Sequence, residues 1–264
     1  MDREMTQALQ TYDAPGPEAW WTDFFINDHV RFQMALAEES HDSDVETDLF
    51  IRLASITPGD HVLDVPCGQG RHAIRLAKFG ADVAGVDASP GMIERAKANA
   101  RDQSVQVSWI HSDMRHVESD PVFDCVICLG GSFGYFGRSG DRNFLSTLLR
   151  VLRPGGFLVL DAPSLEVIRA HHEPRHESIF EGMSVVQQRY LDPTSGIARI
   201  DVTIDSGFGP SSRSYYQQLY LVDELRAMLA VSGFEVCEVL DASGVSEYRT
   251  NTGHVLISAR RPGE

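Results

Sequence analysis

The 264-residue chain is 42% hydrophobic and 23% charged, a composition that excludes disorder over most of its length. Its formal net charge of −15 repels polyanions, so we expect no nucleic-acid partner. No stretch approaches the roughly 20 apolar residues of a membrane span, and the sequence starts without the basic-then-apolar order of a signal peptide. We therefore expect a cytoplasmic protein with no membrane partner.

The first 44 residues are predicted to form a helical segment. The aromatic pairs Trp20-Trp21 and Phe24-Phe25 follow a Pro-Gly-Pro breaker, and short helices are expected at about 18–25 and 28–39. A polar stretch at 38–44 predicts a loop. Apolar residues at helical spacing then predict a helix over 45–56.

From residue 61 onward, strands and helices alternate along the chain. A serine followed by proline at Ser89-Pro90 is typical of a helix start. The turn Arg153-Pro154-Gly155-Gly156 is expected to separate the last helix of this series from its last strand. Such β-α alternation predicts a mostly parallel sheet with helices on both faces. We predict strands at 61–65, 82–87, 105–110, 123–129 and 157–161, and helices at 71–79, 90–100 and 141–152.

The pattern changes after Asp161. Residues 178–220 contain three β-like runs, and in one of them Ile200, Val202 and Ile204 alternate with polar residues, as in a half-buried antiparallel strand. A helix at 222–231 and strands at 234–240 and 254–259 are expected to follow. We predict a single α/β domain with a cofactor-binding core at 45–177 and 221–264, a helical lid at 1–44 and an inserted lid sheet at 178–220.

Polar and glycine residues follow each of the predicted parallel strands, where ligands bind in open α/β sheets. Gly68 and Gly70 come after the first strand and permit close approach of a ligand to the backbone. Asp87 ends the second strand and is suited to a ribose diol, although a helix-capping role is an alternative. Asp113 and Met114 follow the third strand and are suited to an adenine ring, although a solvated loop acid is an alternative for Asp113.

The glycine loop by itself fits two cofactors. Gly68-x-Gly70-x-x-Ala73 with Asp87 is also similar to a dinucleotide-binding fingerprint. Asp64 inside the first strand is a carboxylate suited to a cofactor that carries an ammonium and a sulfonium. That residue and the turn at 153–156 favour S-adenosylmethionine over a nicotinamide dinucleotide.

Together, these motifs resemble the class I S-adenosylmethionine-dependent methyltransferase family of the small-molecule type. The run Val62 to Gly70 looks like its first motif, and Phe123-Asp124-Cys125-Val126 looks like the strand before its catalytic pocket. The resemblance implies a Rossmann-like sheet of seven strands, of which 254–259 is the antiparallel one. It also implies S-adenosyl-L-methionine as the cofactor.

The resemblance assigns the cofactor's parts to residues of this chain. The Gly68–Gly70 backbone and Asp64 would hold the methionine portion, and the Leu129 carbonyl would lie near its ammonium. Asp87 would hold the ribose, and Asp113 and Met114 the adenine. The complete predicted cofactor-binding set is Asp64, Pro66, Gly68, Gln69, Gly70, Asp87, Ala88, Asp113, Met114 and Leu129.

The predicted catalytic residues are Tyr135, His72 and His29. Tyr135 lies in Ser132-Phe133-Gly134-Tyr135-Phe136, the best candidate wall of the acceptor pocket, where it would orient the acceptor or simply pack as an aromatic. His72 follows the glycine loop, and His29 lies in the predicted lid. Each is a candidate base, with a packed or capping role as the alternative.

No metal site is predicted. The histidine-rich run 171–177 is expected to be a solvated linker because it lacks the i, i+4 pair of a helical zinc site. Cys125 and Cys128 are expected to be small buried residues, since residues three apart on a strand point to opposite faces.

We therefore predict an enzyme that transfers a methyl group from S-adenosylmethionine to nitrogen or oxygen of a small molecule, as a monomer or homodimer. The two lids and the absence of an Asn/Asp-Pro-Pro-aromatic run after the fourth strand favour a small acceptor. The alternatives are an NAD(P)-dependent oxidoreductase and a non-catalytic protein that binds S-adenosylmethionine.

Overall fold

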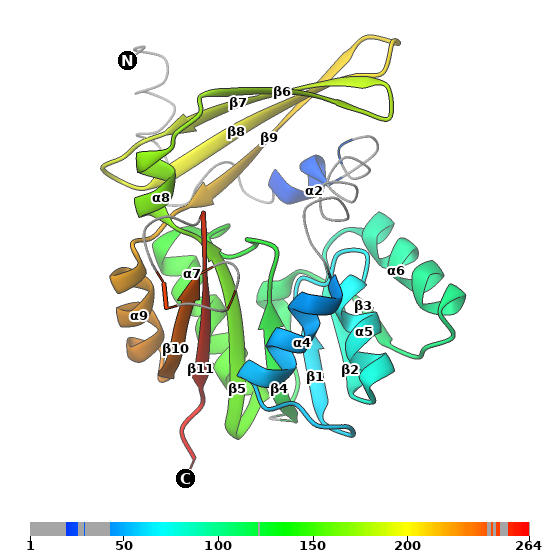
Figure 1. The fold of residues 1–264 in the computed structure, drawn as a ribbon, viewed down its shortest axis with the longest axis vertical. Helices are drawn as coiled ribbons and strands as arrows, with labels where there is room; N and C mark the ends of the chain where they lie inside the picture. Colours follow the sequence, from blue (N-terminus) through cyan, green and yellow to red (C-terminus); the bar gives the residue numbers. More distant parts are fainter. Residues whose placement is uncertain are drawn as a thin grey trace.

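The computed structural model describes residues 20–25, 29, 43–120, 122–241, 244, 247, 248 and 253–263. Its frame consists of a seven-stranded sheet and a separate four-stranded antiparallel sheet, which lies across one end of the larger one (Figure 1). The larger sheet contains β1 (His61–Asp64), β2 (Asp82–Asp87), β3 (Ser108–His111), β4 (Phe123–Cys128), β5 (Leu152–Pro163), β10 (Glu235–Asp241) and β11 (His254–Arg260).

The strand order of the larger sheet is β10-β11-β5-β4-β1-β2-β3. Strands β1 to β5 are parallel to one another, whereas β11 is antiparallel to both β5 and β10. The chain changes direction along the sheet between β1 and β4, where ligands bind in such folds. The predicted Rossmann-like class and the antiparallel strand at the C-terminal end are confirmed.

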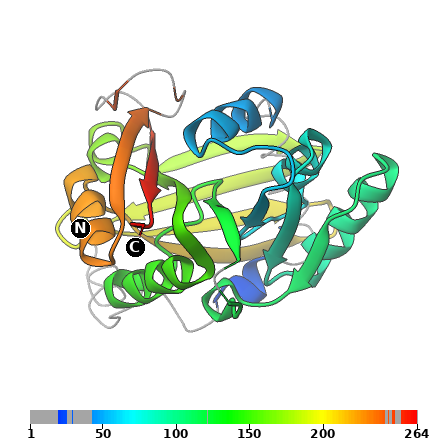
Figure 2. The same ribbon diagram turned by 90° about the horizontal axis from the view of Figure 1, so that it is seen from below.

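Helices cover both faces of this sheet, as Figure 2 shows from below. On one face α7 (Gly137–Val151) and α9 (Val222–Val231) bury their apolar sides, and on the other α4 (Ser43–Leu53) and α5 (Arg71–Phe79) do so. Cys128 belongs to the first apolar cluster and Cys125 to the second, as expected for residues on opposite faces of β4. Helices α6 (Pro90–Asp102) and α8 (Leu165–Ala170) and the short 3-10 helix η1 (Met114–His116) complete this part.

The second sheet has four strands rather than the three that the sequence predicts: β6 (Arg175–Phe180), β7 (Met183–Leu191), β8 (Ile197–Asp205) and β9 (Pro210–Gln218). The prediction missed β6 because its polar residues are largely exposed on an edge strand and leave no alternating apolar pattern. Residues 175–177, predicted as linker, are thus part of this strand. Inward residues of β7 and β8 form a third apolar cluster with Trp20 and Phe24 of α2 (Trp20–Phe24).

Several element boundaries differ from the prediction for local reasons. Helix α7 begins at Gly137 rather than 141, and β3 begins at Ser108 rather than 105. Strand β5 includes the predicted turn at 153–156 because its register to β4 jumps there, with Phe123 opposite Leu152 but Cys125 opposite Phe157. Helix α8 was not predicted. The expected helix at 28–39 lies outside the described residues apart from His29.

No helix among the described residues is long and apolar enough to cross a membrane.

Candidate active site

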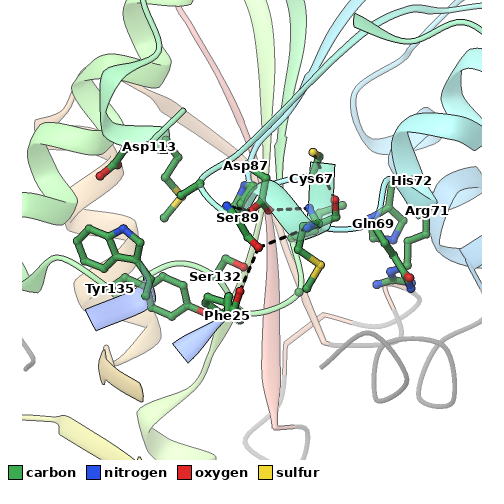
Figure 3. Close-up of a pocket in the computed structure, with 18 of the residues that line it drawn as sticks. Phe25, Cys67, Gln69, Arg71, His72, Asp87, Ser89, Asp113, Ser132 and Tyr135 are labelled. Carbon is green, nitrogen blue, oxygen red and sulfur yellow. Dashed lines mark hydrogen bonds between the residues drawn. The ribbon is translucent and has the colours of Figure 1, made fainter. Parts of the chain in front are cut away.

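A cavity lies at the carboxyl edge of the larger sheet, where loops after four parallel strands meet α2 (Figure 3). Trp21 and Phe25, from the beginning of the described chain, line one side of it. Its lining residues are Trp21, Phe25, Pro66, Cys67, Gly68, Gln69, Arg71, His72, Asp87, Ala88, Ser89, Met92, Asp113, Met114, Leu129, Gly130, Ser132, Tyr135 and Phe136.

The two glycines of the first loop have different roles. Gly68 has a φ of +53°, a Cβ there would meet nothing within 4 Å, and the residue lines the cavity. Gly70 has a φ of +82°, and a Cβ there would lie 2.4 Å from the Trp109 ring. The structure therefore explains Gly70 by the packing of Trp109 beneath the loop, and Gly70 itself is outside the cavity lining.

Asp87 fastens the glycine loop to the end of β2. Its Oδ2 accepts a hydrogen bond from the Gly68 amide at 2.9 Å, and its Oδ1 accepts one from the Ser89 amide at 2.8 Å. Burial raises the pKa of this carboxyl, and the two amides partly offset that effect. Because a carboxylate has about four acceptor positions, two remain after these bonds.

Asp64 lies behind the loop, at the end of β1, and does not line the cavity. Its side chain is almost fully buried, and within the described part of the chain its Oδ2 has no hydrogen-bond partner. Burial raises the pKa of Asp64 to about 7, despite the opposing effect of Arg71 and of the Ala73 amide. Near neutral pH this carboxyl is thus balanced between its protonated and ionised forms.

Asp113 and Met114, which follow β3, line the cavity together with Ala88 and Met92. The Asp113 carboxylate is bound by Arg115, whose Nη2 donates to Oδ2 at 2.7 Å and whose amide donates to Oδ1 at 2.9 Å. Burial raises the pKa of Asp113, but the Arg115 contacts outweigh burial and hold it below its usual value. Asp113 is therefore an ionised acceptor at the cavity edge.

The loop after β4 forms the opposite wall. The Gly131 amide donates to Asp161 Oδ2 at 2.8 Å, and Asp161 Oδ1 contacts His254 Nδ1 at 2.8 Å. From the lid sheet, Gln217 Nε2 donates to the carbonyl oxygens of Gly131 and Phe133 at 2.5 and 2.8 Å. These contacts tie the loop to both sheets and fix the positions of Leu129, Gly130 and Ser132 at the cavity.

Tyr135 is the one predicted catalytic residue that this loop carries. Its ring packs edge-on against Trp20, with centroids 5.0 Å apart, and its hydroxyl lies near the Ser132 side chain. Burial raises the pKa of the phenol far above its usual value. Tyr135 is accordingly a proton-carrying group at neutral pH, suited to donate a hydrogen bond rather than to remove a proton.

The two predicted histidines lie in different places. His72 lines the cavity, but its Nε2 contacts Glu46 Oε2 at 3.0 Å, and the same oxygen accepts from Arg71. In Figure 3, His72 and Arg71 lie across the cavity from Tyr135. His29 is outside the lining, and its Nε2 contacts the carbonyl oxygen of Val202 in the lid sheet at 3.0 Å.

No group of three or more His, Cys, Asp or Glu residues within the described ranges is arranged to hold a metal ion. Cys125 and Cys128 are free thiols buried in β4.

Comparison with known proteins identifies the type of site. The family model described as a methyltransferase domain matches residues 62–156, which include the glycine loop and Asp87. The glycine/sarcosine N-methyltransferase of Aphanothece halophytica is 31% identical over 225 residues, covering 83% of this chain and 77% of that protein. The chain belongs to the class I S-adenosylmethionine-dependent methyltransferase family.

Two further similarities agree with this membership. The glycine/sarcosine N-methyltransferase of Parasynechococcus marenigrum is 36% identical over 167 residues, 62% of this methyltransferase and 55% of that protein. An S-adenosylmethionine-dependent methyltransferase from Clostridium acetobutylicum has the same fold, with a TM-score of 0.78 at 14% identity, covering 90% of this chain and all of that one. S-adenosylmethionine is accordingly the cofactor, and the nicotinamide interpretation of the glycine loop is set aside.

The residues present fit this cofactor. Oδ2 of Asp64, at the end of β1, is a buried acceptor without a hydrogen-bond partner among the described residues, Asp87 has acceptor positions left for a diol, and Met92 and Met114 add apolar surface to the cavity lining. The cavity and the residues behind it thus offer carboxylate acceptors and apolar surface of the kinds that this cofactor needs.

Some lining residues were not assigned from the sequence. Trp21 and Phe25 stood out as an aromatic cluster, but only the tertiary fold brings them to the cavity. The predicted N-cap role of Ser89 is confirmed, since its Oγ accepts a hydrogen bond from the Met92 amide, and its hydroxyl also donates to the Phe25 carbonyl. Arg71 directly follows the loop and could have been selected on that position alone.

Proposed function

We propose that this methyltransferase transfers the methyl group of its cofactor to the nitrogen of a small-molecule amine. The observation that carries the proposal is the cavity itself, which continues from the glycine loop past Gly130 and Ser132 to the side chains of Trp21, Tyr135 and Phe136. The two N-methyltransferase relatives support nitrogen as the acceptor atom.

The cofactor side of the cavity would bind S-adenosylmethionine and align its methyl group. S-adenosylmethionine, when bound, supplies a methyl group already activated on a sulfonium sulfur. Asp87 and Asp113 would hold its ribose and adenine from the cavity wall, and the Leu129 carbonyl would lie beside its ammonium, whose charge the Asp64 carboxylate would favour from behind the glycine loop. Alignment within a dry site then provides most of the rate enhancement, since no covalent step on the protein is needed.

On the acceptor side, aromatic rings form the walls. Such faces attract cationic groups, so Trp21, Phe25, Tyr135 and Phe136 are suited to an amine that becomes cationic as it is methylated. The Tyr135 hydroxyl would orient the acceptor as a donor or through Ser132. Because this phenol keeps its proton and His72 is engaged with Glu46, we expect the amine to enter in its neutral form.

The lid segments and the core have different proposed roles. We propose that 1–44 and 178–220 act as lids over a core formed by 45–177 and 221–264, and that together they form one domain. Lids of this kind exclude water and limit the size of the acceptor. The contacts of Gln217 with the loop after β4 support this division, since they join the lid sheet to the wall of the cavity.

The test is an acceptor screen with purified protein and S-adenosylmethionine. Glycine and sarcosine, taken from the relatives' names, and an amino sugar are each compared with the alcohol that replaces the amine by a hydroxyl. We expect S-adenosylhomocysteine and an N-methylated product from amines only. Methylation of the alcohols, or cofactor binding without turnover of any amine, would contradict the proposal.

A further inference from the structure

Arg115 joins the cofactor side of the cavity to its acceptor side. It lies in η1, immediately after β3, and its guanidinium binds the Asp113 carboxylate through Nε at 3.1 Å to both oxygens and through Nη2 at 2.7 Å. The pair is partly buried, with 34% of the Arg115 side chain exposed and 19% of that of Asp113. Arg115 is thus held in one orientation by the acid beside it.

In that orientation, the guanidinium also contacts two aromatic rings. Its central carbon lies 4.8 Å from the centroid of the Trp21 ring and 4.9 Å from that of Phe136. The two rings themselves meet edge to face at 5.4 Å, and both line the cavity. One side chain therefore connects the N-terminal helix α2, the end of β3 and the loop after β4.

Helix α2 needs such a connection because its other contacts lie mainly with the lid sheet. Trp20 and Phe24 pack into the cluster formed with β7 and β8, so the helix is anchored on that side. Toward the larger sheet, Ser89 Oγ donates to the Phe25 carbonyl at 3.1 Å, as Figure 3 shows. Arg115 adds the contact that places Trp21, the residue between these anchors, against the cavity wall.

Arginine suits this position chemically. A planar guanidinium binds a carboxylate in its plane and stacks on aromatic rings with its faces, which a lysine ammonium cannot do at once. Its positive charge would also oppose a cationic cofactor nearby, but the Asp113 carboxylate neutralises it. The local arrangement therefore adds rigidity without adding net charge to the site.

We propose that Arg115 is a positioning residue that latches α2 to the core and thereby makes Trp21 a wall of the acceptor pocket. The latch follows from the contacts alone, whereas its effect on the acceptor rests on the proposed function. The two parts are therefore tested by separate measurements.

The chain contains a matched control for this test. Arg199 binds Asp201, also two residues away, through Nε at 2.8 Å and Nη2 at 2.7 Å, and its guanidinium lies 5.5 Å from the Tyr190 ring. Exposure of the two side chains is similar, 36% and 14%. Arg199 lies on the face of β8 that points away from the apolar cluster, so Arg199→Gln removes the same chemistry away from the cavity.

Hydrogen exchange of the protein without acceptor tests the latch. In Arg115→Gln, we expect amides of residues 21–25 to exchange about tenfold faster, the change that corresponds to roughly one lost stacked ion pair. Arg115→Lys should give a smaller increase, and Arg199→Gln none in this segment. Unchanged exchange in a folded Arg115→Gln protein would overturn the latch, whatever its activity.

Steady-state kinetics test the consequence for the acceptor. Arg115→Gln and Trp21→Ala should each raise the acceptor KM about tenfold, and in Trp21→Ala, which keeps the Arg115–Asp113 pair, the cofactor dissociation constant should change less than threefold. The double variant should be no worse than either single one, because both remove the same wall. Additive effects, or an unchanged acceptor KM with a loosened α2, would overturn the acceptor role. If the wild type methylates no amine, the proposed function fails and the latch is judged by exchange alone.

Discussion

The proposed cofactor side and the proposed acceptor side of the cavity are built in different ways. On the cofactor side, Gly68, Asp87 and Asp113 each lie within a few residues of the end of a strand, and adjacent parallel strands bring them together. On the acceptor side, Trp21 and Phe25 come from the N-terminal segment, Tyr135 from the loop after β4, and Gln217 supports that loop from the lid sheet. One sheet places the first set, whereas three separate segments must pack to place the second.

The difference extends to the forces involved. Hydrogen bonds between backbone amides and carboxylates dominate the cofactor side, as in the bonds from Gly68 and Ser89 to Asp87. Packed rings dominate the acceptor side, as in the contact of Trp20 with Tyr135. If the two ends are independent, a substitution on the cofactor side should alter cofactor affinity. A substitution on the acceptor side should alter turnover or acceptor affinity.

Among the substitutions that test this difference, Asp87→Ala should have the largest effect, and the effect should be on cofactor affinity. Loss of hydrogen bonds to a charged acceptor should weaken S-adenosylmethionine binding by about 1.5–3 kcal/mol, and the Gly68 amide also loses its partner. Isothermal titration calorimetry measures the change. Asp82→Ala, at the exposed start of the same strand, is the control and should bind the cofactor normally. An unchanged dissociation constant in Asp87→Ala would remove Asp87 from the site.

Tyr135→Phe tests the acceptor side. Without the hydroxyl, an oriented acceptor loses one hydrogen bond, so kcat/KM should fall by about 10–30-fold while cofactor affinity stays the same. Tyr190→Phe in the lid sheet, next to Arg199 and away from the cavity, should leave both unchanged. Full turnover in Tyr135→Phe would mean that the ring only packs.

The raised pKa of Asp64 predicts a smaller, pH-dependent effect on cofactor affinity. Its pKa is raised to about 7, and a bound ammonium favours the ionised form, so affinity should rise about tenfold between pH 6 and 8 and then level off. Asp64→Asn should bind more weakly at pH 8 and lose most of this slope. Asp141→Asn removes another buried carboxyl with a pKa raised to about 7 and is the control. It should keep the wild-type pH dependence of cofactor affinity.

The same raised pKa has a consequence for stability. Asp64 binds its proton more tightly in the folded than in the unfolded protein. Its favourable contribution to the free energy of unfolding is therefore complete below about pH 4 and is lost as the pH rises through about 7. Asp64→Asn should therefore be more stable than the wild type at pH 8. Urea unfolding of the wild type and of Asp64→Asn at pH 5 and at pH 8 measures this difference. If the difference in unfolding free energy between the two proteins is the same at both pH values, Asp64 is not buried in the charged form.

These differences also explain how far the sequence could predict the structure. The β-α series and the placement of Gly68 and Asp87 followed from local patterns, because each depends on a strand and the loop next to it, whereas the antiparallel direction of β11 followed only from the family resemblance. Strand β6 was missed because it carries no alternating apolar residues. Trp21 and Arg115 were not assigned to the site, since their places depend on packing between segments more than ninety residues apart. Gly70 was placed on the correct loop, but its contact with Trp109 is a tertiary one.

The most direct test of the account is mass spectrometry of a single reaction mixture. Purified protein is incubated with S-adenosylmethionine carrying a labelled methyl group and with the best amine from the acceptor screen. We predict that S-adenosylhomocysteine and labelled N-methylated amine form in equal amounts over time. Cofactor that is bound but recovered unchanged with every amine, or label found on oxygen, would contradict the account.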